Sequence, residues 1–125
     1  MKTELSDGEW TLMNRLWEVP GSTITELTAA MRDETGWSKH TIISMLSRME
    51  AKGAIAYEQS GRAKAWYPLL RRSYATRKET RRFLDKVYGG SLGLMVNAMA
   101  DSRDLSPEDI EELSRILEKA KEGLQ

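Results

Sequence analysis

Polar side chains at residues 38–48 alternate with apolar residues at helical spacing, and a short hairpin with a basic turn follows them. One face of such a helix is polar and the opposite face can be buried. The major groove of DNA admits a single helix whose first residues reach base edges, while basic side chains contact phosphates. We therefore predict DNA contacts from eight residues: Ser38, Lys39, His40, Thr41, Ser44 and Arg48 in the helix, and Arg62 and Lys64 in the hairpin.

A second interpretation stands beside this one, because most polar helix faces are simply solvated. His40 is as readily an incidental residue near a helix start as a base contact. The basic residues of the next helix also allow two interpretations: they form either a solvated face or a second surface that faces phosphates. These residues are Arg71, Arg72, Arg77, Lys78, Arg81 and Arg82. Four aromatic residues lie on apolar faces and are predicted to be core rather than stacking platforms: Trp10, Trp17, Trp66 and Tyr67.

Other chemistries find little support in the residue types. The chain has one histidine and no cysteine, which excludes disulfides, thiolate metal sites and cysteine nucleophiles, and His40 alone cannot form a zinc site. There is no Gly-rich phosphate loop and no carboxylate pair with a recognisable pocket. We predict no enzyme activity, no metal and no cofactor.

The sequence also predicts the helices and the hairpin that precede and follow this segment. Capping boxes at 6–9 and 23–26 start two helices, Ser38 caps the third, and the period then changes to alternation over a hairpin at about 55–67 with its turn at Gly61-Arg62. A basic helix is expected at 72–87, and Gly89-Gly90 then breaks or bends the chain. The fold class is mainly α with a small β-hairpin wing: a winged helix-turn-helix DNA-binding domain over residues 1–70 and a helical dimerisation domain over 71–125, joined by the basic helix 71–88.

The C-terminal part carries apolar residues that short helices cannot bury within one chain. We expect them to be buried in a homodimer, and the residues concerned are Leu92, Leu94, Met95, Val96, Met99, Ile110, Leu113, Ile116 and Leu117.

Charge is distributed unevenly although the formal net charge is zero. Residues 1–70 carry a net −1, residues 71–88 a net +5 and residues 89–125 a net −4. Positive charge in the middle of the chain favours double-stranded DNA as a partner. No apolar run is long enough to span a bilayer and the N-terminus has no export signal, so a cytoplasmic protein without stable membrane insertion is expected.

Several segments together resemble the penicillinase repressor and methicillin-resistance repressor family, over roughly residues 5–121. They are LSDGEWTLMNRLW, TITEL, SKHTIISMLSRMEAKGAI, YEQSGRAKAWYPL, FLDKVYGGSLGLMVNAMA and DLSPEDIEELSRILEK. The resemblance implies a dimeric winged-helix repressor of β-lactam-resistance-type genes that binds a palindromic operator. It supports Ser38, Thr41 and Arg48 as DNA contacts.

The resemblance also implies that a sensor-linked protease relieves repression by cutting the C-terminal lobe, which places the possible cleavage between Asn97 and Ala98. Two residues depart from the family pattern. Ile43 stands where a basic residue is usual, which suggests a different operator, and Ala98 stands where a bulky aromatic is expected, so cleavage stays open. Copper-responsive members carry a cysteine cluster that this chain lacks. The alternative function is a winged-helix protein-interaction module without specific DNA binding.

Overall fold

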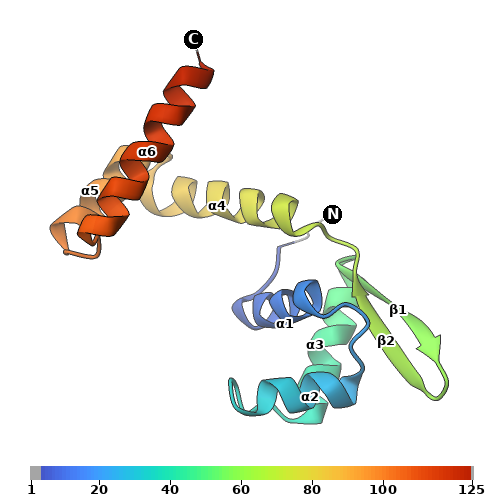
Figure 1. Cartoon of the computed structure of the whole chain (residues 1–125). Coiled ribbons are helices and arrows are strands. Elements are labelled where there is room, and N and C mark those ends of the chain that lie inside the picture. The colour runs from blue at the N-terminus through green and yellow to red at the C-terminus, as the bar shows by residue number, and fades with distance from the viewer. Residues whose placement is uncertain (1–3, 125) are drawn as a thin grey trace. The chain divides into compact units, whose positions relative to one another are not determined.

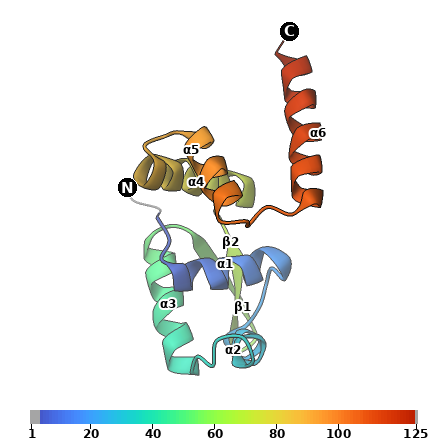
Figure 2. The same ribbon diagram turned by 90° about the vertical axis from the view of Figure 1, so that its left-hand side faces the viewer.

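The computed structural model describes residues 4–124 and is mostly helical, with one two-stranded antiparallel sheet (Figures 1 and 2). The fold class expected from the sequence is confirmed. In chain order the elements are α1 (Asp7–Glu18), α2 (Ile24–Arg32), α3 (Lys39–Ala51), β1 (Ile55–Ser60), β2 (Ala63–Pro68), α4 (Arg72–Tyr88), α5 (Leu92–Asp101) and α6 (Pro107–Gly123).

Side-chain caps begin the first three helices where the sequence predicts them. Ser6 and Thr23 accept hydrogen bonds from the backbone N–H of Glu9 and Glu26, whose carboxylates accept in return from the cap backbone. Ser38 caps α3 by accepting from Thr41 N–H at 3.2 Å. Each cap satisfies donors that a helix start leaves without partners, so the helix boundaries are fixed locally.

The core lies among α1, α2, α3 and the base of the hairpin (Figure 1). Its most buried residues are apolar and recur at helical spacing on the three helices: Leu12, Met13 and Leu16; Leu27 and Met31; Ile42, Leu46 and Met49. Ile55 and Trp66 close it from the two strands. Because the inward face of α3 is buried in this core, its opposite face is exposed to solvent and available for contact with DNA.

The hairpin is closed by a two-residue turn at Gly61 and Arg62, because Ser60 pairs with Ala63 in the strand register. Gly61 has φ +64°, which suits a glycine at the first position of a type II′ turn. At the other end, Trp66 N–H donates to the Ser22 carbonyl at 2.9 Å, and the Trp66 carbonyl accepts from Gly21 N–H at 2.7 Å. The start of α2 is thereby tied to the wing.

The four aromatic residues predicted to be core differ in their burial. Trp66 is buried and that prediction is confirmed. Trp10 and Trp17 are half-buried and pack against the core as an edge-to-face pair with centroids 5.7 Å apart. The prediction is wrong for Tyr67, which is exposed, because consecutive strand residues point to opposite sides and Trp66 takes the inner one.

The chain divides into two compact units between Glu79 and Thr80, within α4. The first unit takes in the domain expected at 1–70 together with the first part of α4. The second unit contains α5 and α6, in neither of which is any residue buried. No helix among residues 4–124 is long and apolar enough to cross a membrane.

Candidate nucleic-acid interface

The N-terminal end of α3 presents a group of exposed or half-exposed polar side chains. Lys39 and His40 are exposed and Thr41 is half-buried. The Ser38 and Thr41 hydroxyls lie 3.1 Å apart within hydrogen-bond distance, so the capping interaction also fixes the direction of the Thr41 side chain. A threonine held in this way is positioned at the end of the helix that reaches bases most easily in a winged-helix fold.

Further along α3, Ser44 is half-buried and Arg48 is exposed. The Arg48 guanidinium is turned toward α1, where its Nε lies 3.5 Å from Glu9 Oε2. It shares this carboxylate with Lys52, whose ammonium donates to Glu9 Oε1 and to the Glu4 carbonyl. The structure therefore places Arg48 on the exposed surface but with an intramolecular partner, which was not predicted from the sequence.

Glu9 is the buried centre of this network, with its side chain only 1% exposed. Burial by itself raises the pKa of a carboxyl group, but here hydrogen bonds from Lys52 and from Ser6 N–H outweigh it, helped by the charges of Lys52 and Arg48. The pKa of Glu9 accordingly lies below its ordinary value. An ionised Glu9 joins α1 to the C-terminal end of α3 and fixes the direction of α3 relative to α1.

The hairpin contributes the other two predicted cations. Arg62 occupies the turn and is exposed, while Lys64 follows it in β2. The Lys64 ammonium lies 4.2 Å from the centre of the Tyr57 ring on the neighbouring strand. This cation–π contact holds the lysine against the wing without removing its charge from solvent.

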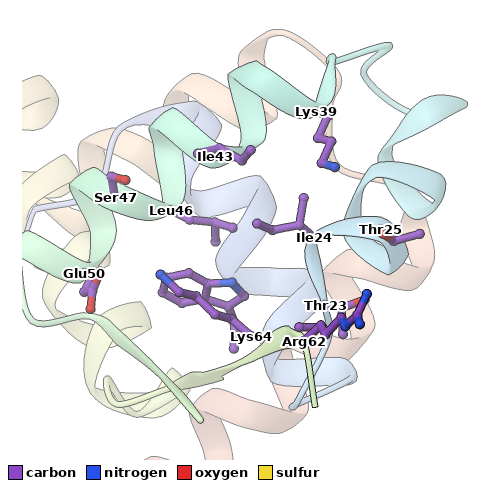
Figure 3. Close-up of a pocket in the computed structure, with 12 residues that line it drawn as sticks. Thr23, Ile24, Thr25, Lys39, Ile43, Leu46, Ser47, Glu50, Arg62 and Lys64 are labelled. Carbon is purple, nitrogen blue, oxygen red and sulfur yellow. The ribbon is translucent and has the colours of Figure 1, made fainter. Parts of the chain in front are cut away.

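Between α3 and the wing lies a hollow of about 400 Å³ (Figure 3). It brings Lys39 of α3 together with Arg62 and Lys64, three of the eight residues predicted to contact DNA. The predicted helix residues Ser38, His40, Thr41, Ser44 and Arg48 are not part of its lining. Three cations against the single carboxylate of Glu50 make the hollow suited to a polyanion.

The lining also includes residues that were not predicted to contact DNA. Among them are Thr23, Ile24 and Thr25 at the start of α2, and Ile43 and Ser47 on α3 (Figure 3). The capping box at Thr23 was visible in the sequence, but its proximity to the wing depends on the Ser22–Trp66 pairing. In the described part of the chain, no group of three or more His, Asp or Glu residues could hold a metal ion.

The residues predicted to dimerise and to be cut lie in the second unit. The dimerisation set is on α5 and α6, where all are exposed except the half-exposed Met95, Val96 and Leu113. Asn97 and Ala98 are both exposed and lie within α5.

The chain is similar to known proteins in sequence and in fold. The family described as penicillinase repressor matches residues 5–119. The methicillin resistance regulatory protein MecI of Staphylococcus aureus is 30% identical over 116 residues, which are 93% of this chain and 94% of that protein. Two solution structures of the repressor BlaI are also similar in fold.

The first is of the DNA-binding domain of BlaI, with a TM-score of 0.53 and 29% identity over 58% of this chain and 92% of that one. The second is of monomeric BlaI from Bacillus licheniformis in complex with the blaP half-operator, with a TM-score of 0.50 and 28% identity over 56% of this chain and 85% of that one.

Proposed function

Because the chain belongs to the penicillinase repressor family, whose members are transcriptional repressors and not enzymes, we propose that it represses transcription as a dimer bound to a palindromic operator. The regulated genes would be of the β-lactam-resistance type. Such a repressor works in the cytoplasm, and a sensor-linked protease would relieve it. The observation that carries the proposal is that Lys39, at the exposed start of α3, lines one hollow of the first unit together with the wing cations Arg62 and Lys64.

Binding to DNA would divide the surface into two roles. The N-terminal end of α3, with Ser38, Lys39, His40, Thr41 and Ser44, would enter the major groove and contact base edges. Arg62 and Lys64 would lie against the phosphates beside it. The complex of the similar BlaI with a half-operator supports this choice of ligand. Arg48, which is already paired with Glu9, would contribute to phosphate binding from the other flank of α3.

Dimerisation is supported by the apolar surface of the second unit. Leu92, Leu94, Ile116 and Leu117 are each more than half exposed, although side chains of this kind are usually buried. A second copy would cover them through a self-complementary contact, as in most homodimers. The buried face would consist of the nine apolar residues of α5 and α6 identified in the sequence.

Relief by proteolysis is proposed for the Asn97–Ala98 bond. Both residues are exposed, and α5 buries none of its own side chains, so this helix can open at little cost in packing. A cut here would separate most of the apolar residues of α5 from those of α6 and weaken the dimer.

Binding of the full chain to the DNA upstream of its own gene, measured by mobility shift at several salt concentrations, tests the proposal. If a dimer neutralises roughly six to ten phosphates, log K should fall against log salt with a slope of about −5 to −9. Random DNA of equal length serves as the control. Binding without sequence preference and with a slope near zero would contradict the proposal and favour the protein-interaction module.

A further inference from the structure

Ile43 is an aliphatic side chain exposed on the helix that we assign to the major groove. It is 39% exposed, and its exposed neighbours within one helical turn are polar, namely Lys39, His40 and Ser47, while Leu46 on its inner side is buried. Single apolar residues on a surface are ordinary and need no explanation by themselves. The position of Ile43 is what matters, because it borders the hollow beside the wing between Lys39 and Ser47 (Figure 3).

The major groove offers one apolar group for such a side chain. Each base presents hydrogen-bond donors or acceptors there, and thymine alone adds a methyl group at C5. Isoleucine has no donor or acceptor, so it cannot pair with the polar edge of any base. Placed over cytosine, it would cover the N4 amino group without offering it a hydrogen-bond partner.

We propose that Ile43 is a specificity-determining residue that packs against a thymine methyl group in each half of the operator. This inference rests on the proposed function, because it assumes that α3 lies in the major groove. The branched side chain suits the role, since isoleucine in a helix has essentially one χ1 rotamer and loses little freedom on contact. The cations around the hollow would attract the phosphates of DNA of any base sequence, and Ile43 would add a preference among base pairs.

Deoxyuridine provides the experiment, because it lacks only the C5 methyl group of thymine and keeps its pairing. The protected region is first located by footprinting with the full chain. Each thymine in one half-site, with its symmetry mate, is then replaced by deoxyuridine, and affinity is measured for the wild-type chain and for Ile43→Ala. At one thymine the wild-type chain should lose roughly 3- to 10-fold in affinity per half-site, and Ile43→Ala should lose almost nothing.

Two further variants separate a base contact from a structural role. Val19→Ala removes a β-branched residue that is also exposed in the first unit but lies at the end of α1 and does not line the hollow. This variant should keep the full deoxyuridine penalty. Ile43→Val should retain part of it, and all variants should unfold at temperatures close to the wild-type chain.

The outcomes distinguish this inference from the function on which it rests. If the full chain shows no sequence preference for its upstream DNA, the proposed function is wrong, and the role proposed for Ile43 is wrong with it. If the chain binds its operator specifically but no thymine is sensitive to deoxyuridine, or if Ile43→Ala keeps the same penalty, only the role of Ile43 is overturned.

Discussion

Glu9 is the residue that links α3 to the start of α1. Its carboxylate caps the start of α1 through Ser6 N–H and binds Lys52 and Arg48 of the C-terminal half of α3. The carboxylate itself is only 1% exposed, so these hydrogen bonds and charges take the place of the water that it loses on burial. One side chain thus stabilises a helix start and fixes the direction of another helix.

Glu9→Gln tests this coupling through the pH dependence of stability. The pKa of Glu9 is lowered in the folded state, so its contribution is complete above the unfolded value of about 4.5 and is lost as pH falls through the lower folded value. We expect the free energy of unfolding of the wild-type chain to fall between neutral pH and about pH 3 more steeply than that of Glu9→Gln. Urea unfolding at each pH measures both.

Glu26→Gln is the matched control, because Glu26 also completes a capping box but is exposed. It should leave the steepness of the wild-type curve nearly unchanged. An equal reduction by both variants would mean that capping alone, rather than the contact with α3, accounts for the effect of Glu9.

At the scale of elements, the proposed function predicts separate roles for α3 and the hairpin in DNA binding. Thr41 is held at the start of α3 by Ser38, whereas Arg62 lies in the hairpin turn. Thr41→Ala should reduce affinity for the operator by about 1–3 kcal/mol at particular base pairs and thereby relax specificity. Arg62→Ala should weaken binding to operator and random DNA alike and lower the salt slope by about one unit. Titrations of both variants on both duplexes across a salt series measure this.

Arg115→Ala is the control for charge, because Arg115 is exposed on α6, outside the first unit, and pairs with Glu111 one helical turn away. It should leave the salt slope unchanged. Equal losses for Thr41→Ala on operator and random DNA would remove Thr41 from the residues that read bases.

The order of the elements was predictable because its signals are local. Capping residues, apolar spacing and Gly61 each act within a few positions, and they placed the helices and the hairpin turn close to where the structure has them. The Glu9 network was not predictable, since Lys52 lies 43 residues away from Glu9 in sequence. For the same reason, the hollow could not be found: Thr25, Ile43 and Arg62 come together only when α2, α3 and the wing pack.

The whole molecule combines one unit with a packed core and another in which α5 and α6 bury none of their residues. A stop codon after Tyr88 would keep α4 complete and remove α5 and α6. We expect residues 1–88 to remain folded, because the core of the first unit is intact, but to be monomeric and to bind the operator weakly. Solution mass and operator affinity, compared with the full chain, measure this.

Leu94→Asp tests the proposed dimer contact in the full chain without removing α5 and α6. Leu94 is exposed on α5, so the charge can be introduced without disturbing a buried core. This variant should also produce monomers while leaving thermal unfolding of the first unit unchanged. A truncated chain that stays dimeric, or that binds its operator as tightly as the full chain, would show that the second unit has another role.

The proposal that a dimer binds a palindromic operator is tested most directly by titrating the full chain against two duplexes of equal length. One duplex contains the whole operator palindrome and the other contains a single half-site. A dimer whose two DNA-binding units are linked makes the second binding event intramolecular, which raises affinity by roughly 10²–10⁴. The proposed function predicts two chains on each palindrome and an affinity for it higher than for the half-site by about this factor. One chain on each duplex with equal affinity, or no preference for either duplex over random DNA, would contradict it.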